Sequence, residues 1–276
     1  MHINSQTTLN MVIGYPLSHT QSPLLHTHLY QHLKLNAVLL AFSNQHIESL
    51  LTTIKTLNVT LTAVTLPFKE SVLPYLQHCS PEGQAIKAVN TIIQRDGELH
   101  GYNTDVDGIA YAFNQVTLTN KRVLIIGAGG AARASGYLMQ KENAQLFWLN
   151  RTQQRAEKLA ADFSGTVVGQ QATDDLDYDI IINTTPLGMS PNIHQSPLPN
   201  VRFRTDQVVF DMVYNPLKTQ LLVQAEQNGA HIISGMDMFI GQAIRQIELW
   251  QQAPIDKTVL MNEIKHLLLK QQSLGV

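Results

Sequence analysis

The first third of the chain alternates short apolar runs with amphipathic stretches. Buried strands give short apolar runs, whereas helices repeat their apolar positions about every 3.6 residues. By this criterion strands are expected near residues 11–13, 37–42 and 60–66, and helices near 22–33 and 46–57. The alternation favours a parallel sheet with helices packed against it.

The helix expected at 22–33 has both a start signal and an apolar face. Ser22-Pro23 supplies an N-cap followed by a first-turn proline. Leu25, Leu29 and Leu33 then recur every four residues, which places them on one face of a helix. We therefore expect this face to pack on the sheet.

A hairpin is expected near the end of the first series. Residues 90–94 and 98–102 flank Arg95-Asp96-Gly97, a short turn that contains glycine. The hairpin would finish the first sheet, and a helix would begin after it near Asp105.

A second alternating series follows, with strands expected at 123–126, 145–149, 179–182, 208–211 and 231–234. It predicts a Rossmann-like doubly wound domain. From about Met238 the chain has two helical patterns and no strand, so these helices are expected to return to the first domain. The fold prediction is two α/β domains, one of residues 1–102 plus 238–276 and one of 103–237, with the active site in the cleft between them.

Composition favours a small soluble partner. With 276 residues, 44% of them hydrophobic, the chain can form two cores, since a domain usually holds about 100 to 200 residues. The formal net charge is -2, with both signs mixed along the chain. Neither a basic stripe for nucleic acid nor a polybasic membrane anchor is present in this pattern.

The sequence also argues against export, a membrane span and a metal. Residues 1–10 are polar, and no apolar run reaches the about 18 residues that a membrane span requires. A cytoplasmic location is therefore predicted. The single cysteine, Cys79, has no internal disulfide partner, and no Cys pair or His-x-x-x-His spacing suggests a metal cage. His26 and His28 are interpreted as surface or packing residues.

A dinucleotide-binding turn is the strongest local motif. The strand at 122–126 leads into Gly127-Ala128-Gly129-Gly130-Ala131-Ala132, and a helix follows. Glycines let the backbone approach a pyrophosphate, and the helix N-terminus presents free N–H groups to it. Ala132 replaces the third glycine of the usual pattern but still allows close helix packing. The alternative is a tight turn that binds nothing.

The end of the next strand favours NADP over NAD. An NAD-binding domain usually has a carboxylate there to hold the ribose 2′-hydroxyl, but this chain has Asn150-Arg151-Thr152. Arg151 can bind a 2′-phosphate through two hydrogen bonds, and Arg155 adds a second positive charge one turn later. Both arginines could instead be an ordinary solvated helix start.

Several separated segments occur in an order that resembles the shikimate dehydrogenase family from Val12 to about Leu249. These segments are Ile13-Gly14-Tyr15-Pro16, His19-Thr20-Gln21-Ser22-Pro23, Val64-Thr65-Leu66-Pro67-Phe68-Lys69, Ala88-Val89-Asn90-Thr91, Asn103-Thr104-Asp105-Val106-Asp107-Gly108, Asn183-Thr184-Thr185-Pro186-Leu187-Gly188-Met189, Asp211-Met212-Val213-Tyr214-Asn215-Pro216 and Gly235-Met236.

The resemblance implies NADPH-dependent reduction of 3-dehydroshikimate to shikimate, a step toward chorismate and the aromatic amino acids. It implies a catalytic pair, Lys69 and Asp105. The substrate-binding side chains that it implies are Thr20, Ser22, Thr65, Asn90, Tyr214 and Gln242. The cofactor segment would comprise Gly127, Ala128, Gly129, Gly130, Ala131, Asn150, Arg151, Thr152, Arg155, Met212 and Gly235.

The chemistry explains why these residue types occur together. Hydride transfer to a ketone leaves an alkoxide, which a lysine–aspartate pair can protonate and stabilise. Which of Lys69 and Asp105 gives the proton stays open, because a coupled pair shares its titration. A polyol acid also needs several hydrogen-bonding side chains around it.

Two positions depart from the family pattern. Thr20 stands where the family usually has serine, and Ala63 stands where an asparagine usually precedes Val-Thr. Thr20 keeps the hydroxyl, whereas Ala63 removes an amide that could position the substrate or the Lys69 loop.

Three rival functions share parts of this pattern. A quinate/shikimate dehydrogenase of broader cofactor use would share Lys69 and Asp105 but often uses NAD, against which Arg151 argues. A relative of methylenetetrahydrofolate dehydrogenase fits the segments at 19–23 and 103–108 poorly. The retained pair argues against a non-catalytic NADP-binding regulator, whereas Ala63 leaves that alternative open. The oligomeric state stays open, with a homodimer as one option.

Overall fold

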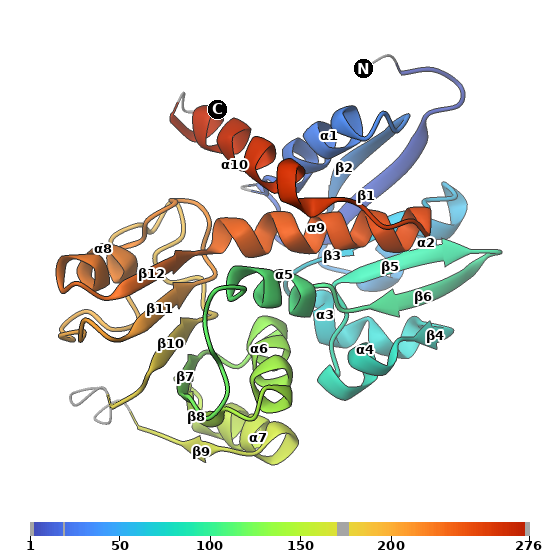
Figure 1. The fold of residues 1–276 in the computed structure, drawn as a ribbon. Coiled ribbons are helices and arrows are strands. Elements are labelled where there is room, and N and C mark those ends of the chain that lie inside the picture. The colour runs from blue at the N-terminus through green and yellow to red at the C-terminus, as the bar shows by residue number, and fades with distance from the viewer. Residues whose placement is uncertain (1–2, 19, 170–176, 274–276) are drawn as a thin grey trace. The chain divides into compact units, whose positions relative to one another are not determined.

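The chain divides into two compact units in the computed structural model, which describes residues 3–18, 20–169 and 177–273. The first unit comprises residues 1–108 and 240–276, and the second comprises 109–239. The chain passes between the units within helices α5 (Asp105–Ala112) and α9 (Gly235–Gln251). Figure 1 shows the elements of each unit.

The first division lies after residue 108, whereas the sequence placed it after 102. The reason is local bonding. The Asn103 side chain donates to the Ala88 carbonyl at 2.8 Å, and the Thr104 N–H donates to Asn90 Oδ1 at 2.7 Å. These bonds tie the start of α5 to the first unit.

The first unit contains a six-stranded sheet in the order β2-β1-β3-β5-β6-β4. Its strands are β1 (Thr8–Gly14), β2 (Ala37–Ser43), β3 (Leu61–Val64), β4 (His78–Cys79), β5 (Thr91–Arg95) and β6 (Glu98–Tyr102). The expectation of a parallel sheet is only partly right, because β5 runs antiparallel to both β3 and β6. The predicted hairpin reverses the chain at Asp96 and Gly97, whose φ angles of 52° and 81° suit a two-residue turn.

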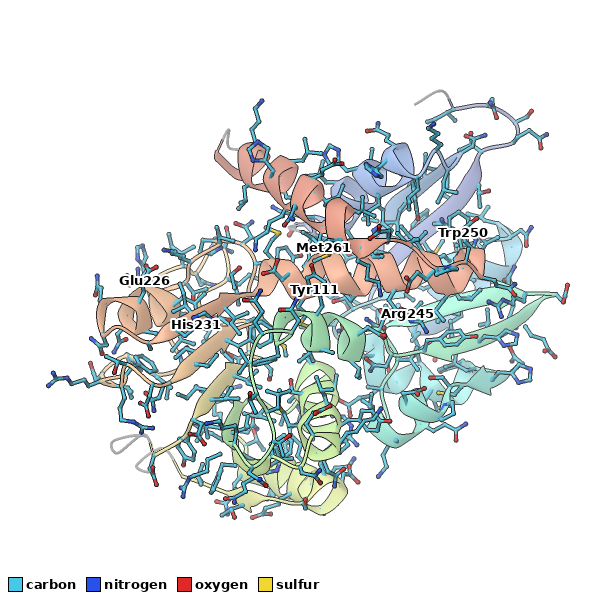
Figure 2. All side chains as sticks on the ribbon, in the orientation of Figure 1. Tyr111, Glu226, His231, Arg245, Trp250 and Met261 are labelled. Carbon is cyan, nitrogen blue, oxygen red and sulfur yellow. The ribbon has the colours of Figure 1, made fainter. Side chains whose placement is uncertain are left out.

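Helices cover this sheet. They are α1 (Ser22–His32), α2 (Ile47–Thr56), α3 (Phe68–Ser71), α4 (Pro81–Ile86), α10 (Lys257–Ser273) and the larger part of α9, with a 3-10 turn at Leu73–Tyr75. The N-cap of α1 is Gln21, not Ser22, which is already the first helical residue. Trp250 of α9 packs against Tyr30 of α1, with ring centroids 5.8 Å apart, and Figure 2 labels Trp250 near the end of α9 and Met261 on α10. The C-terminal helices thus belong to the first unit, as expected.

The second unit confirms the predicted doubly wound domain. Its sheet is parallel throughout and has the strand order β12-β11-β10-β7-β8-β9. From β7, successive strands are added first on one side (β8, β9) and then on the other (β10, β11, β12), as in a doubly wound sheet. Its elements are β7 (Arg122–Ile126), α6 (Gly130–Lys141), β8 (Gln145–Leu149), α7 (Gln153–Phe163), β9 (Thr166–Val167), β10 (Ile180–Asn183), β11 (Val208–Asp211), α8 (Gln220–Gln227) and β12 (His231–Ser234). Figure 1 shows α6 and α7 beside β7 and β8, and α8 beside β11 and β12. Among the described residues, no helix is long and apolar enough to cross a membrane.

Candidate active site and cofactor segment

Lys69 and Asp105 meet in the first unit. Lys69 Nζ lies 2.5 Å from Asp105 Oδ2, and the two side chains are 15% and 5% exposed. A lysine–carboxylate pair this well shielded from water interacts much more strongly than a surface ion pair. The structure therefore brings together the two residues that the family resemblance put forward as a catalytic pair.

Local structure fixes both partners. Lys69 lies in the short helix α3, whose Phe68 is buried in the core, and its carbonyl accepts the Val89 N–H at 2.7 Å. Asp105 is the first residue of α5. Its N–H donates to Asn103 Oδ1 at 3.1 Å, so the Asn103 side chain bonds the N–H at the helix start and the Asp105 carboxylate is left for Lys69. A carboxylate in the first turn is also favoured by the helix dipole.

Asn90 organises the polar groups around this pair. Its side-chain amide donates to Asp105 Oδ1 at 2.8 Å and lies 3.0 Å from Thr104 Oγ1. Its side-chain oxygen, Oδ1, accepts from Thr91 Oγ1 at 2.9 Å. Asn90 is buried, and a buried amide with satisfied hydrogen bonds holds one orientation. Asp105 is thus fixed from two sides, by Lys69 and by Asn90.

The other proposed substrate residues of this unit lie at defined positions. Gln242 Oε1 is 3.5 Å from Asn90 Nδ2. Thr65 follows β3, and Gly14 at the end of β1 packs so closely against it that an added Cβ would lie 2.6 Å from Thr65 Cγ2. Thr20 and Ser22 form a pair, with their hydroxyl oxygens 3.3 Å apart. His19, which belongs to the same segment, lies outside the described residues.

Sequence reasoning missed a buried relay that connects the Ser22 segment with Asn90. His26 Nδ1 lies 2.9 Å from the Ser22 carbonyl, and its Nε2 lies 3.2 Å from Gln246 Oε1. Gln246 Nε2 in turn donates to Thr91 Oγ1 at 3.1 Å. One indication of this relay was present in the sequence, because Gln242 and Gln246 are four residues apart and therefore lie on one face of α9.

Burial keeps the His26 imidazole neutral. His26 is fully buried, which lowers its pKa from 6.5 to about 4, while the hydrogen bonds to Ser22 and Gln246 act in the opposite direction. Both neighbouring atoms are acceptor oxygens, which favour the protonated ring, but desolvation of the charge is the larger effect. Of the two roles expected for His26, surface or packing, the structure shows the second, with a hydrogen-bonded ring.

The glycine-rich turn of the second unit leaves an open space before α6. Gly127 has a φ of +113°, and an added Cβ would collide with Thr184 Oγ1. Gly129, the N-cap of α6, has a φ of -100°, and an added Cβ would meet no atom within 4 Å. A side chain at Gly129 would therefore project into this open space, next to the free N–H groups of the helix, where a pyrophosphate would fit.

Two guanidinium groups follow β8. Arg151 and Arg155 are exposed, and within the described part of the chain neither guanidinium forms a hydrogen bond or ion pair. Asn150 Nδ2 donates to the Thr152 carbonyl at 2.8 Å, which shapes the turn that presents Arg151. The turn holds no carboxylate, so its charge suits the additional phosphate of NADP.

Asp211 was not anticipated as an ordering residue of the second unit. It ends β11, and its carboxylate accepts from Thr219 Oγ1 at 2.6 Å, Asn183 Nδ2 at 3.0 Å and the Val213 N–H at 3.0 Å. Burial raises its pKa to about 6, while these three donors lower it. Asp211 thereby joins the ends of β10 and β11.

Met212, Tyr214 and Gly235 lie next to this network. The Tyr214 ring stacks on Phe239, with centroids 4.0 Å apart and planes inclined by 9°. A Cβ at Gly235 would collide with the Met212 carbonyl oxygen, so only glycine allows the start of α9 to approach the segment after β11 this closely.

Two family models match the chain. The model described as shikimate dehydrogenase substrate binding domain matches residues 12–92, and that described as shikimate / quinate 5-dehydrogenase matches residues 110–213. The curated shikimate dehydrogenase (NADP(+)) of Carboxydothermus hydrogenoformans is 37% identical over 264 residues, or 91% of this chain and 94% of the relative. The chain belongs to the shikimate dehydrogenase family.

Solved shikimate dehydrogenases share the architecture. One crystal structure in complex with NADP+ matches with a TM-score of 0.87 and 34% identity, covering 95% of this chain and 96% of that one. The Thermus thermophilus enzyme, solved with NADP(H) and shikimate, matches with a TM-score of 0.84 and 31% identity, covering 94% and 98%. The predicted two-domain α/β fold is thereby confirmed.

In this member of the shikimate dehydrogenase family, Ala63 lies at the centre of the first sheet. It is buried in β3 and is the register partner of Thr91 in β5. Register partners point to the same face of a sheet, so the Ala63 methyl lies on the face that carries the Thr91 hydroxyl. That hydroxyl donates to Asn90 Oδ1, accepts from Gln246 Nε2 and lies 3.2 Å from Thr104 Oγ1. These bonds order this face without an amide at position 63.

Proposed function

We propose that the chain is an NADP-dependent shikimate dehydrogenase that interconverts 3-dehydroshikimate and shikimate. Its catalytic pair is Lys69 and Asp105. The observation that carries this assignment is the contact of 2.5 Å between Lys69 Nζ and Asp105 Oδ2 inside a largely buried polar cluster. The family membership supports the same reaction.

In this proposal the pair donates a proton to the substrate oxygen and stabilises the charges that take part in the transfer. NADPH, when bound, provides the hydride that adds to the ring carbonyl carbon. The carbonyl oxygen then gains negative charge, and the Lys69 ammonium donates a proton to it. Asp105 accepts from Lys69 and Asn90, so it holds the ammonium group in place and stabilises its charge. In the reverse direction the same pair accepts the proton of the ring hydroxyl.

The remaining side chains would bind and orient the substrate. Thr20 and Ser22, whose hydroxyls lie together, would bind the carboxylate. Thr65, Asn90 and Gln242 would bind ring hydroxyls. Tyr214 is proposed as a further substrate-binding side chain. A site in which so many side chains pair with the substrate should reject analogues that leave them without a partner.

The second unit would hold the cofactor through backbone and charge. Gly127 to Ala131 would carry the pyrophosphate on the N-terminus of α6. Arg151 and Arg155 would bind the 2′-phosphate, with Asn150 and Thr152 shaping the turn. Met212 and Gly235 would lie against the cofactor at the other end.

A four-way assay tests the proposed function. Absorbance of the reduced nicotinamide is followed with shikimate or quinate as substrate and NADP or NAD as cofactor. Activity confined to shikimate with NADP is the expected result. Comparable rates with quinate or NAD would replace the proposal by a broader quinate/shikimate dehydrogenase. NADP binding without turnover in any combination would favour a regulator, and restoring asparagine at position 63 would then be the next experiment.

Two further expectations concern the whole protein. A cytoplasmic location is checked by cell fractionation. The open question of a homodimer is decided by sedimentation velocity of the full chain, where a species at twice the chain mass would support the dimer and one at the chain mass would exclude it.

A further inference from the structure

Three side chains that can ligate metals lie together at the free edge of the first sheet. β4 pairs with β6 in parallel, and His78 is the register partner of His100. Glu98 lies two residues before His100 on β6, so both side chains point to the same face. Leu99, between them, is buried in the core. His78, Glu98 and His100 therefore share the solvent face of this edge.

The three groups already touch. The imidazole rings of His78 and His100 stack with centroids 4.4 Å apart and planes inclined by 20°. His78 Nε2 lies 2.8 Å from Glu98 Oε2. One ligand atom from each residue can be chosen so that all three lie within 4.8 Å of one another. Among the described residues, no other group of three His, Cys, Asp or Glu side chains meets this condition.

We propose that His78, Glu98 and His100 bind a divalent transition-metal ion of the zinc class. Two imidazoles and one carboxylate are a ligand set that Zn²⁺ uses in proteins, with a remaining position taken by water. Zinc–ligand bonds of about 2.0 to 2.2 Å would require the three groups to draw slightly closer through side-chain rotation. The exposed side chains of His78 and Glu98 leave the ion an entry path.

Occupancy would join β4 to β6. β4 is a two-residue edge strand, so a metal bridge between His78 and the two β6 ligands would add a cross-link where the sheet has little backbone pairing. An ion that binds only the folded state stabilises it by mass action. This site has no part in the proposed reduction, so its test is independent of the enzyme assay.

The charges around the site set its pH dependence. Partial burial lowers the pKa of His100, the charges of His78 and Arg95 lower it further, and Glu98 and Asp96 raise it. Neutral imidazole is the form that binds metal. Affinity should therefore fall as the solution is acidified and protons compete with the metal for the imidazoles.

Calorimetric titration of the untagged, metal-free full chain with zinc chloride tests the proposal. Wild type should bind one equivalent at this site. His78→Ala and His100→Ala should each weaken zinc binding at least about tenfold. Substitution of a residue that only hydrogen-bonds to a metal ligand already costs that much affinity. His231→Ala removes an exposed strand histidine of the second unit (Figure 2) and should leave zinc binding unchanged.

Cobalt(II) provides a second measurement. Wild type should show visible absorption of coordinated cobalt, and Glu98→Gln, which keeps the shape of the side chain, should weaken it. Circular dichroism of each variant checks folding. Absence of saturable binding to wild type, or equal affinity in wild type and all three site variants, would overturn the proposal.

Discussion

The candidate residues of the two units differ in burial and in hydrogen bonding. In the first unit, Lys69 and Asn90 both donate to Asp105, and all three side chains are largely buried. In the second unit, Arg151 and Arg155 are exposed, and the described residues offer their guanidinium groups no partner. A Cβ added at Gly129, the N-cap of α6, would meet no atom within 4 Å.

The difference follows from what each unit has to bind. A proton donor must be held in place before the substrate arrives, because reorganising it during the reaction would cost free energy. A large anionic cofactor instead needs charges and N–H groups that are not already used, since each bond broken on binding would weaken affinity. Substitutions in the first unit should therefore lower turnover or stability, and those in the second should lower cofactor affinity.

The largest effect is expected for Lys69→Ala. It removes the proposed proton donor, so kcat should fall about 100-fold or more while NADP affinity stays nearly unchanged. Steady-state kinetics and fluorescence titration with NADPH measure the two quantities. Lys55→Ala, at an exposed position of α2, is the matched control and should change neither. An equal loss of cofactor binding would contradict the assigned role.

The relay in the first unit should make stability depend on pH through His26. Its folded pKa of about 4 lies below the ordinary 6.5, so between these values only the unfolded chain binds the proton. Stability is complete above pH 6.5 and is lost as the pH falls toward 4, by on the order of 3 kcal/mol. Urea unfolding of wild type and His26→Gln across this range measures the loss, which the variant should lack.

Asp211 in the second unit provides a control, because its contribution to stability changes with pH in the opposite direction to that of His26. Its pKa is raised to about 6, so its contribution to stability is present below about pH 3.8 and is lost as the pH rises through 6. Asp211→Asn should remove that slope and leave the His26 slope intact. Identical pH profiles for wild type and His26→Gln would show that the imidazole is not held neutral by burial.

The fold could be predicted where the chain has local signals. The strands of the second unit are buried apolar runs, and the turn at Gly127 to Gly130 has a recognisable glycine pattern. The hairpin was evident from Asp96-Gly97. β4 could not be predicted, because two residues carry no periodicity and its pairing with β6 is set by tertiary packing.

The candidate site was harder to predict for the same reason. Lys69, Asn90 and Asp105 were found through their segments' resemblance to a family, since their separations along the chain say nothing of a contact. The relay from His26 to Gln246 spans 220 residues of sequence. The cluster of His78, Glu98 and His100 likewise escaped a search for metal-ligand spacing, because its ligands are brought together by strand pairing.

In the second unit, Gly129→Ala distinguishes a turn that binds the cofactor pyrophosphate from a tight turn that binds nothing. The φ of -100° and the open space at this position allow a methyl group, so stability should change by less than about 0.5 kcal/mol. If the pyrophosphate lies there, the methyl displaces it, and NADP affinity should fall at least about tenfold, or ~1.4 kcal/mol. Gly127→Ala is the contrast, because its positive φ and the contact with Thr184 should destabilise the fold itself.

Arg151→Ala should have the smallest effect and should distinguish the two cofactors. Removing one guanidinium from a 2′-phosphate site costs about tenfold in NADP affinity, or ~1.4 kcal/mol, while NAD, which lacks that phosphate, should bind as before. The ratio of the two dissociation constants is the measurement, and Arg202→Ala, another exposed arginine of the second unit, is the control. The NADP effect should shrink at high salt, because an exposed charge pair is screened. Equal losses for NADP and NAD would mean that Arg151 contacts a part common to both, and selectivity would then have to come from Arg155.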